Sequence, residues 1–363
     1  MKIGINLLNF PEKLGGAGYY AYNILENMLK HVGDKKYFIF VPPKSNFEKL
    51  DLNKAFKIIR IPVGSQITRI LIEQLVLPFM LYYHRINVIY SPSVALPYLF
   101  FGKKVVTIHD LLFMENPSKY PYLRRNYIRI VTYLSAISSS HVFTVSEKSR
   151  NMIIKEYNLP FSKVSVTYNS GSVSYEINKI PNEVTKLKYF IYVGAIEPGK
   201  NLELLIEVYS KIKEKYPEIK YLFTTGIGWR VNPILELIDK KLSDSAVYLG
   251  YPDRIALEKY IINSIALIYL SVYEGFGLPV IESIYYGKKP IVPKISPYIE
   301  YCNSNNSILL ESLNVEYVTN CLEQCFRGKI DTSVSDFEIM ELRKKCDWEK
   351  SYSTIIKIIN TYE

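Results

Sequence analysis

The chain has 363 residues, of which 48% are hydrophobic and 22% charged, and this composition excludes a disordered tail and a small disulfide-stapled scaffold. The formal net charge of +10 favours an anionic partner, which leaves nucleic acid, an anionic lipid surface and a phosphorylated small molecule as candidates. The four cysteines form no C-x-x-C pair, which indicates free thiols in a reducing cytoplasm and argues against a cysteine metal site. We expect neither a signal peptide nor a membrane-spanning helix.

Short apolar strands alternate with amphipathic helices along the whole chain. The first half is expected to contain strands near residues 2–8, 36–42, 57–63, 87–93, 103–110, 141–146 and 163–169. After a polar segment the pattern restarts, with strands expected near residues 189–194, 220–226, 246–250, 266–271 and 289–293. This alternation predicts parallel sheets covered by helices on both faces. We therefore expect two doubly wound α/β domains joined near residues 175–188.

Polar and glycine-rich segments follow the expected strand ends, where such folds bind ligands. Gly15, Gly16 and Gly18 lead directly into a helix, and small residues at a helix N-terminus suit phosphate binding. The alternative is a plain tight turn, because the spacing is not G-x-G-x-x-G. His109 and Asp110 follow the fifth strand, where a functional role and a packed histidine are both open.

The second half repeats this arrangement. Its first strand ends at Gly194, and Lys200 and Asn201 stand at the entrance to a long helix. A lysine at that position can reach a phosphate as a mobile charge, and the alternative is a solvated lysine.

The stretch EGFGLPVIE, residues 274–282, places two glutamates around a glycine-rich turn. Glu274 begins the loop and Glu282 falls in the first turns of the next helix, so both carboxylates are expected to border one ligand. Carboxylates accept hydrogen bonds from the paired hydroxyls of a ribose or hexose. The simpler alternatives are a helix-dipole contact for Glu282 and a solvated charge for Glu274. Amides that can bind ligand oxygens belong to Gly275, Phe276, Gly277 and Leu278.

Taken together, these motifs resemble those of glycosyltransferase family 4, retaining GT-B glycosyltransferases that include polysaccharide mannosyltransferases. EGFGLPVIE is similar to the family's E-x7-E signature, VGAIEPGKN to its second-domain opening, TIHDL to its histidine loop and GGAGYY to its glycine loop. WEKSY resembles the terminal helix that crosses back to the first domain. The resemblance implies a GT-B fold with two Rossmann-like domains facing across a cleft. Residues 1–180 would bind the acceptor, residues 181–345 the nucleotide sugar, and residues 346–363 would form the crossover helix.

The resemblance also implies a role for each residue. Glu282 would bind the ribose of the nucleotide sugar, Glu274 with the Phe276 and Gly277 amides the transferred sugar, and Lys200 with the Gly16 loop the diphosphate. His109, with Asp110, would lie on the acceptor side. Tyr251 would lie in the base-binding loop. The implied catalytic residues are His109, Lys200 and Glu274, and the remaining implied donor-binding residues are Gly15, Gly18, Gly194, Asn201, Gly275 and Leu278.

The implied activity is retaining transfer of a hexose from a nucleotide sugar, GDP-mannose before a UDP sugar, to a saccharide acceptor. We expect that acceptor to be lipid-linked, in cell-surface polysaccharide synthesis. The chain contains no D-x-D motif, so no cofactor and no metal held by the protein is expected. One departure is Gly199, where many relatives have an arginine. Either Lys200 suffices, or another cation such as Arg230 substitutes, or activity is weakened or lost.

The partners and alternatives complete the expectations. Arg124, Arg125 and Arg129 alternate with aromatic and aliphatic residues in a segment that fits either an anionic membrane surface or an ordinary basic helix face. The protein is expected in the cytoplasm, peripherally on the inner face of the cell membrane. An inactive, partner-binding GT-B subunit is the main alternative. A nucleic-acid-binding protein is disfavoured because no motif for it appears, and a dehydrogenase because neither domain opens with G-x-G-x-x-G.

Overall fold

The computed structural model describes residues 1–10, 15–43, 45, 47, 55–117, 120–171, 187–197, 199–224 and 232–363. These residues form two compact units. Unit 1 consists of Met1–Met114, Tyr120–Asn169 and Cys346–Glu363, and unit 2 of Glu115–Lys119 and Ser170–Lys345. Arg230 lies outside the described residues, as does most of the segment expected to join the domains.

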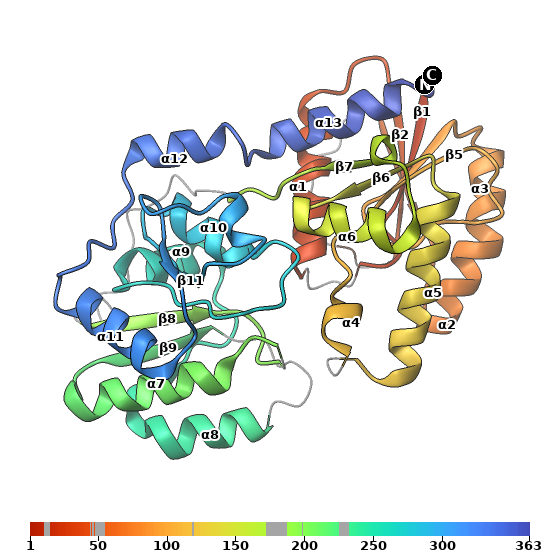
Figure 1. Ribbon diagram of the computed structural model, residues 1–363. Coiled ribbons are helices and arrows are strands. Elements are labelled where there is room, and N and C mark those ends of the chain that lie inside the picture. Colours follow the sequence, from red (N-terminus) through yellow and green to blue (C-terminus); the bar gives the residue numbers. More distant parts are fainter. Residues whose placement is uncertain are drawn as a thin grey trace. The chain divides into compact units, whose positions relative to one another are not determined.

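Unit 1 is built on a seven-stranded parallel sheet with the order β3-β2-β1-β4-β5-β6-β7 (Figure 1). From β1 the chain adds β2 and β3 on one side of the sheet and then β4 to β7 on the other side. The strand order therefore reverses between β1 and β4, which is the point where doubly wound sheets bind ligands. The expected strands of this half are confirmed, although most end earlier than the apolar pattern. Their bounds are β1 Lys2–Asn6, β2 Lys36–Val41, β3 Phe56–Arg60, β4 Val88–Ser91, β5 Lys103–Thr107, β6 His141–Thr144 and β7 Val164–Val166.

Helices cover the sheet of unit 1, and two clusters of buried side chains fill the space between the layers. Pro78 lies at the start of α3, where its missing N–H is tolerated, and a π-helical segment, η2, precedes it. The helices are α1 Gly16–Lys30, α2 Gln66–Leu71, η2 Ile72–Val76, α3 Leu77–Tyr83, α4 Leu112–Glu115, α5 Tyr122–Ser138, α6 Glu147–Tyr157, the 3-10 turn η4 Phe161–Lys163 and α13 Trp348–Asn360.

Unit 2 contains a three-stranded parallel sheet, β10-β9-β8, and a two-stranded one, β11-β12. The strand expected at residues 266–271 forms only two isolated parallel bridges, Ile191 with Leu267 and Ile268 with Ile291. These bridges nevertheless place the segment between β8 and β11, so it occupies the position of a strand. The strands are β8 Tyr189–Val193, β9 Lys220–Thr224, β10 Ala246–Tyr248, β11 Ile291–Pro293 and β12 Ile308–Leu310.

The helices of unit 2 follow its strand ends, as expected for α/β units. Gly287, at φ +75°, follows the end of α10 and permits the chain to leave the helix. The helices are α7 Leu202–Lys215, α8 Asn232–Leu242, α9 Arg254–Asn263, α10 Leu278–Tyr285, α11 Val315–Phe326 and α12 Asp336–Arg343, with 3-10 turns η5 Ser243–Ser245 and η6 Tyr298–Glu300.

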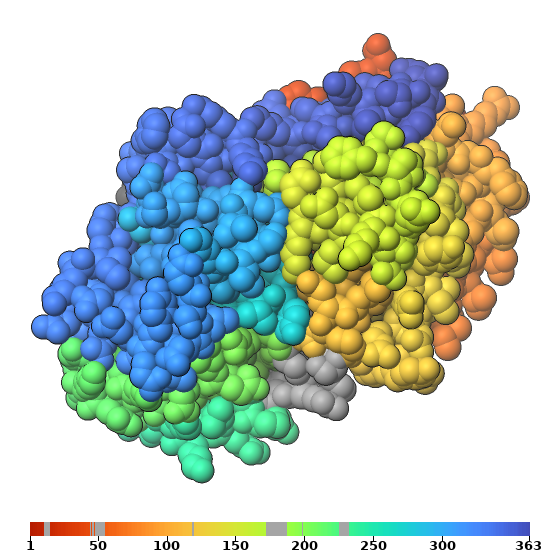
Figure 2. Space-filling view, in the orientation of Figure 1, coloured from red at the N-terminus to blue at the C-terminus, as the bar shows by residue number. Residues whose placement is uncertain are grey.

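The last helix, α13, belongs to unit 1 although it follows unit 2 in the sequence. Ser351 donates a hydrogen bond to the Tyr168 carbonyl at 2.6 Å, and Tyr352 donates one to the His31 carbonyl at 3.0 Å. Figure 2 shows this dark blue segment lying along the surface of unit 1 beside red residues of the amino-terminal part. Among the helices that the structure describes, none combines the length and the apolar character needed to cross a membrane.

Candidate functional site

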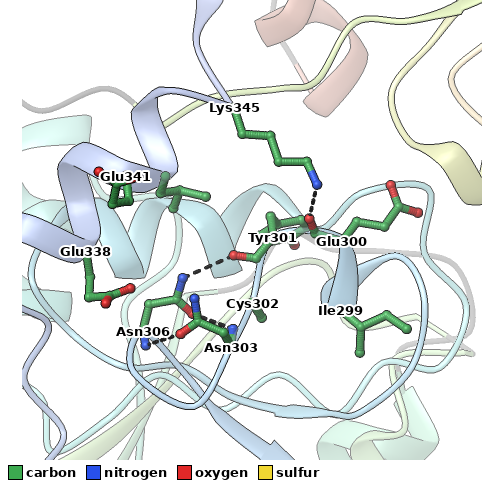
Figure 3. Close-up of a pocket in the computed structure, with 10 residues that line it drawn as sticks. Ile299, Glu300, Tyr301, Cys302, Asn303, Asn306, Glu338, Glu341 and Lys345 are labelled. Atoms are coloured by element: carbon green, nitrogen blue, oxygen red, sulfur yellow. Dashed lines mark hydrogen bonds between the residues drawn. The ribbon is translucent and has the colours of Figure 1, made fainter.

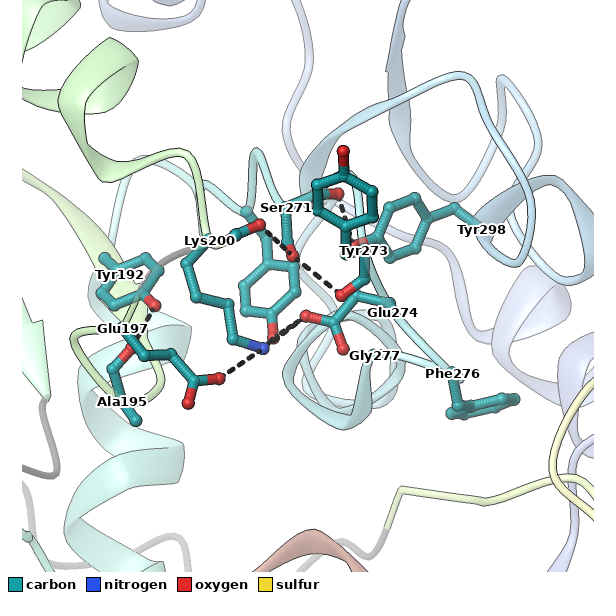
Figure 4. A network of polar contacts seen from close by, with 12 residues as sticks. Tyr192, Ala195, Glu197, Lys200, Ser271, Tyr273, Glu274, Phe276, Gly277 and Tyr298 are labelled. Carbon is teal, nitrogen blue, oxygen red and sulfur yellow. Dashed lines mark hydrogen bonds and ion pairs between the residues drawn. The ribbon is translucent and has the colours of Figure 1, made fainter. Parts of the chain in front are cut away.

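The strongest polar cluster of unit 2 joins Lys200 to Glu274 (Figure 4). The Lys200 ammonium lies 2.5 Å from Glu274 Oε1 and 3.8 Å from Glu197 Oε1. Lys200 also donates to the Tyr269 hydroxyl at 3.0 Å, and Tyr269 donates to Glu274 Oε1 at 2.8 Å. The Lys200 and Glu274 side chains are only 13% and 10% exposed, so solvent screens this pair little.

Burial and pairing act in opposite directions on these charges. Burial by itself raises the pKa of Glu274, but the Lys200 ammonium and the hydrogen bonds from Lys200 and Tyr269 hold that pKa below its ordinary value. Burial lowers the pKa of Lys200, and the Glu274 carboxylate more than offsets this effect and raises it. Both groups are therefore ionised at neutral pH. A cation and a carboxylate, both fixed in a buried setting, can bind a phosphate and sugar hydroxyls respectively.

Glu282 lies in the second turn of α10 and pairs with a residue that the sequence analysis missed. Arg254 Nη2 lies 3.4 Å from Glu282 Oε1, and Arg254 is the first residue of α9. Burial raises the pKa of Glu282 to about 7, the Arg254 guanidinium opposes this rise, and the Glu258 carboxylate adds to it. Glu282 consequently changes charge close to physiological pH, unlike Glu274.

The loop between the two glutamates is held by aromatic side chains of unit 2. Tyr301 donates its hydroxyl to the Phe276 carbonyl at 2.6 Å and to the Gly277 carbonyl at 3.3 Å, and its ring stacks on Phe276 at 4.7 Å. Gly277 has φ +93°, and a Cβ there would lie 2.9 Å from the Tyr298 ring. A glycine is thus required where the chain turns into α10 at Leu278. Gly275 and Phe276 are buried in this loop.

The first strand end of unit 2 has a similarly constrained backbone. Gly194 has φ +151°, and Asn201 adopts a left-handed conformation at φ 55° directly before α7. Gly199 has φ +98°, and a Cβ there would lie 2.5 Å from Asn116 Nδ2. The Asn116 side chain therefore occupies the space into which a side chain at position 199 would project, which is a physical reason for glycine instead of arginine.

In unit 1 His109 lies just beyond the end of β5, next to the reversal point of the sheet. Its Nε2 lies 3.0 Å from the Pro92 carbonyl oxygen, and Pro92 follows β4. Burial lowers the pKa of His109 to about 4, although the bond to Pro92 favours the protonated form. The ring is therefore neutral at pH 7, and since a carbonyl only accepts, Nε2 carries the proton. Nδ1 is then an acceptor.

Neutral hydroxyls surround the same strand ends. The Tyr20 ring meets the His109 ring edge-on, with centroids 5.0 Å apart. Tyr20 and Thr167 share a hydrogen bond of 2.8 Å, and Tyr90 and Thr107 share one of 2.9 Å. These side chains next to His109 are thus polar but uncharged, whereas carboxyl groups lie nearby at Asp110 and at Glu73, which accepts a hydrogen bond from Asn6 at the end of β1 at 3.3 Å.

Other expected site residues have more modest surroundings. Asp110 accepts a hydrogen bond from the Leu112 amide at 3.0 Å and so caps the short helix α4. Gly15 and Gly16 are exposed at the start of α1, Gly18 is buried, and no side chain of a described residue caps this helix. The amides there can bind an anion. Tyr251 is 71% exposed in the turn before α9.

A separate cavity of about 280 Å³ lies in unit 2 between η6 and α12 (Figure 3). Glu300, Glu338, Glu341 and Lys345 line it together with Asn303 and Asn306, and none of the expected site residues is among its lining. Tyr301 lines the cavity as well, so one side chain connects its wall to the loop at Phe276.

Two residues escaped the sequence analysis, namely Tyr269 and Arg254. Tyr269 stands five positions before Glu274 in a segment that reads as a buried strand, where a tyrosine brings a hydroxyl that needs a partner. Arg254 follows an N-capping aspartate, Asp253, and a cation at a helix start is unfavourable unless it has an anionic partner. Both signals were present, but neither identifies the partner.

Comparisons with known proteins cover nearly the whole chain. Residues 14–170 match the family model described as Glycosyltransferase Family 4, and residues 174–329 match the model described as Glycosyl transferases group 1. The O-antigen chain mannosyltransferase RfbU of Salmonella typhimurium is 30% identical over 199 residues, which is 54% of this chain and 54% of that relative. The chain thus matches about half the length of this relative. The O-antigen chain mannosyltransferase B of Escherichia coli is 24% identical over 288 residues, 76% of this chain and 73% of that protein.

Solved structures support the fold. Anabaena HepE, crystallised in complex with UDP and glucose, has a TM-score of 0.75 at 14% identity and covers 99% of both chains. WaaG, a glycosyltransferase involved in lipopolysaccharide biosynthesis, has a TM-score of 0.71 at 14% identity and covers 98% of this chain and 99% of its own. At these identities the likeness concerns the fold alone.

Proposed function

Because the chain belongs to the GT-B glycosyltransferases, with a family 4 domain followed by a group 1 domain, we propose that it transfers mannose from GDP-mannose to a lipid-linked saccharide with retention of anomeric configuration. The choice of mannose is supported by the two relatives named as O-antigen chain mannosyltransferases. A UDP sugar is the next candidate donor, since the HepE structure contains UDP and glucose.

The observation that carries this proposal is the buried Lys200, Tyr269 and Glu274 cluster at the strand ends of unit 2. Lys200 stands two positions before α7 and Glu274 four positions before α10, so both lie near helix N-termini with their positive dipole ends. In the proposed role Lys200 binds the diphosphate, Glu274 the hydroxyls of the transferred sugar, and Glu282 the ribose.

The reaction develops negative charge on the leaving diphosphate and positive charge at the anomeric carbon. Fixed cations and N–H groups directed at that diphosphate stabilise the transition state more than the ground state, which is the largest catalytic contribution in many enzymes. The Lys200 ammonium and the amides at the start of α7 and α10 would supply it. The chain has no D-x-D motif, so we assign no metal to the protein. In the proposed mechanism the leaving phosphate takes the proton of the attacking hydroxyl on the same face of the sugar.

Unit 1 is the proposed acceptor side. His109 is neutral and presents Nδ1 as an acceptor, so it can orient a sugar hydroxyl without placing a charge beside it. Asp110 holds the backbone of this loop through the Leu112 amide and would act by positioning His109.

Calorimetric titration tests the donor. We expect GDP-mannose to bind more tightly than UDP-glucose or UDP-N-acetylglucosamine, and Glu282→Ala to abolish measurable binding. Glu316→Ala is the matched control, because that carboxylate is exposed on α11 and pairs with Lys211 at 2.7 Å. Binding of a UDP sugar alone would replace the donor. No binding of any nucleotide or nucleotide sugar would contradict the proposal and favour the inactive, partner-binding alternative.

Product analysis tests the transfer itself. Incubation with GDP-mannose and lipid-linked saccharides isolated from cell envelopes should yield an extended saccharide. The one-bond coupling between C1 and H1 of the transferred mannose should show the α configuration of the donor. A β linkage would contradict the retaining mechanism while leaving the donor assignment intact.

The proposed membrane contact uses one surface of unit 1. The helical run of residues 66–83 exposes apolar side chains at four-residue spacing, and its charged residues, Arg69 and Glu73, pair with each other at 3.2 Å and are mostly buried. We call this the apolar face; its residues are Ile67, Leu71, Leu75, Phe79 and Tyr83, each at least 53% exposed. Exposed apolar surface of this extent on a helix suits a lipid interface.

Helix α5 lies beside this run in Figure 1, and burial raises the pKa of Tyr127 on α5 while the Arg69 guanidinium acts to lower it. The segment from residue 116 to residue 146 contains no acidic residue, whereas it contains Arg124, Arg125 and Arg129. Leu123 and Ile130 are also exposed on α5, at 81% and 58%. Arginines interspersed with exposed apolar groups complement an anionic lipid surface, which would bring the enzyme to a lipid-linked acceptor.

Vesicle co-sedimentation tests this contact. Arg124→Glu with Arg125→Glu should weaken binding to phosphatidylglycerol vesicles by about 30-fold or more, since each basic residue contributes about 1 kcal/mol at such a surface. Leu75→Ser with Phe79→Ser should weaken it as well. Lys240→Glu with Lys329→Glu changes the net charge equally on exposed residues of unit 2 and should have a far smaller effect. Equal losses in both charge variants would indicate a general charge effect and contradict the proposed surface.

A further inference from the structure

Tyr269 bridges the two charged groups of the unit 2 cluster through one hydroxyl. Its oxygen lies 3.0 Å from the Lys200 ammonium and 2.8 Å from Glu274 Oε1. The Lys200 ammonium also lies 5.3 Å from the centre of the Tyr269 ring. A phenol in this position contacts both groups, in addition to the direct contact between them.

The direction of each hydrogen bond follows from the chemistry of the groups. An ammonium only donates and an ionised carboxylate only accepts, so Lys200 donates to the Tyr269 oxygen and Tyr269 donates its proton to Glu274. Burial raises the pKa of Tyr269 well above its ordinary value, and the Glu274 carboxylate raises it further. The hydroxyl therefore keeps its proton and stays a donor across the physiological pH range.

The surrounding structure holds this hydroxyl in place. The Tyr269 amide donates to the Ile291 carbonyl at 3.0 Å, which fixes the backbone beside β11. Its ring stacks on Tyr192 at 6.1 Å and meets Tyr298 edge-on at 6.4 Å. Those two neighbours donate their hydroxyls to backbone carbonyls, of Ala195 and Ser271 respectively (Figure 4). The neighbouring phenols thus hold loops, whereas Tyr269 contacts the ionised side chains.

We propose that Tyr269 is a positioning residue that keeps Glu274 ionised and oriented while Lys200 donates to the diphosphate. Lys200 has three N–H donors, so it can turn one or two to a phosphate and still donate to the Tyr269 oxygen. Tyr269 keeps its own proton throughout and continues to donate this hydrogen bond to Glu274. This role rests on the proposed function, in which Lys200 binds the diphosphate and Glu274 the transferred sugar.

Tyr269→Phe is the direct test, because it removes one oxygen and keeps the ring. Loss of a hydrogen bond to a charged group should lower kcat by about tenfold and leave the KM for GDP-mannose within about twofold. The Tyr269 hydroxyl lowers the pKa of Glu274, so this pKa should rise in Tyr269→Phe. The acidic limb of the kcat–pH profile should therefore move to higher pH in this variant. A purely structural role for the ring would leave that limb where it is.

Tyr189→Phe is the matched control. Tyr189 is a buried tyrosine on β8 whose hydroxyl donates to the Tyr260 carbonyl at 2.7 Å, away from the charged cluster. The Tyr189→Phe variant should lose about as much thermal stability as Tyr269→Phe but keep the wild-type kcat and the wild-type pH profile of kcat. Equal changes in kcat and in the acidic limb for both variants would overturn the proposal.

A second measurement does not depend on turnover. Carbon-13 NMR of glutamate-labelled protein, with Glu274→Gln for assignment, follows the titration of Glu274 directly. Its midpoint should lie at higher pH in Tyr269→Phe than in the wild type, and an unchanged midpoint would overturn the proposal. If the wild type turns over no donor, the proposed function fails while this titration still decides whether Tyr269 holds Glu274 ionised.

Discussion

Units 1 and 2 both place polar side chains just beyond the carboxyl ends of parallel strands, but the charges of those side chains differ. Unit 2 presents ion pairs, Lys200 with Glu274 at 2.5 Å and Arg254 with Glu282 at 3.4 Å. Around His109, unit 1 presents the neutral imidazole ring and the hydroxyls of Tyr20 and Tyr90, and its Arg69–Glu73 ion pair lies at the end of β1 instead. The same topology thus gives two chemically different strand edges.

This difference indicates different ligands. A diphosphate brings negative charge and needs fixed cations, whereas a saccharide hydroxyl can also be bound by neutral donors and acceptors. The net charge of the chain therefore does not identify its ligand. The positions of the individual cations at the strand edges do. Variants that remove charge from unit 2 should cost far more activity than those that change the neutral edge of unit 1.

Lys200→Met should have the largest effect. It removes the proposed diphosphate cation and leaves Glu274 buried beside Tyr269 without its partner, so kcat/KM should fall by about a thousandfold. The unfolding free energy should fall by about 3 kcal/mol, since breaking one partner out of a buried pair is costly. Steady-state kinetics and urea unfolding measure both. Lys211→Met, which removes an exposed lysine paired with Glu316, should change neither, and a similar loss in this control would show a general effect of lysine removal.

His109→Gln should lower kcat by about a hundredfold, since glutamine can donate to the Pro92 carbonyl as Nε2 does but lacks the ring acceptor. His141 offers a matched comparison, because burial lowers its pKa to about 4 as well, yet it begins β6 at the opposite strand end and contacts Ser165. His141→Gln should keep the wild-type kcat. A similar loss of kcat in both variants would contradict a specific role for His109 at the carboxyl end of β5.

The two histidines also predict a pH dependence of stability. Each has a pKa near 4 in the folded chain and 6.5 when unfolded, so between these values the unfolded chain binds more protons. The contribution of these two histidines to the free energy of unfolding should therefore decrease as pH falls from 6.5 to 4. Either His→Gln variant should weaken this decrease in urea titrations, and an unchanged slope would contradict the neutral assignment.

Glu282→Gln should weaken donor binding by about tenfold to a hundredfold, the value of a hydrogen bond to a charged group. In the wild type, the titration of Glu282 should change donor affinity and the free energy of unfolding in opposite directions as pH rises. With a pKa of about 7 in the folded chain, ionised Glu282 and hence donor affinity should increase from pH 6 to 8. The contribution of Glu282 to the free energy of unfolding should instead decrease by up to about 3 kcal/mol as pH rises from 4.5 to 7, because the folded chain binds the extra proton there. Calorimetry and urea unfolding of wild type and Glu282→Gln separate the two, and parallel trends would be evidence against this assignment.

Gly199→Ala should have the smallest effect on function but a clear one on stability, about 1–3 kcal/mol, because φ +98° strains an alanine and its Cβ displaces Asn116. Adding Asn116→Ala should recover the contact part of this loss, which a double-mutant cycle measures. Gly64→Ala is the control, since a Cβ there would meet only the Thr68 hydroxyl at 3.8 Å. A wild-type Tm for Gly199→Ala would contradict this explanation of the missing arginine.

The sequence predicted most strands well, because apolar runs and glycine-rich turns are local features. The positions of Lys200 and Asn201 before α7 and of Pro279 in the first turn of α10 follow from such patterns. The expected strand at residues 266–271 shows the limit. Its backbone hydrogen bonds to Ile191 of β8 and Ile291 of β11, but it forms only isolated bridges at Leu267 and Ile268 and no continuous strand.

The partners of the site residues were less predictable. Arg254 and Glu282 lie on different helices, and Tyr269 reaches Lys200 across 69 residues. Such pairings depend on the packing of whole elements, which no local spacing encodes. The same holds for Asn116, which follows α4 in the sequence but belongs to unit 2, where it lies beside Gly199.

The placement of α13 has a consequence for how the chain matures on the ribosome. Trp348 packs edge-on against Tyr19 and Tyr20 of α1, with ring centres 6.1 and 5.9 Å away, yet it is translated after all of unit 2. At ordinary elongation rates roughly ten to forty seconds separate the emergence of Asn169 from that of Cys346. During that interval Tyr19 and Tyr20 lack the Trp348 ring, so the packing of unit 1 is completed only near the end of translation.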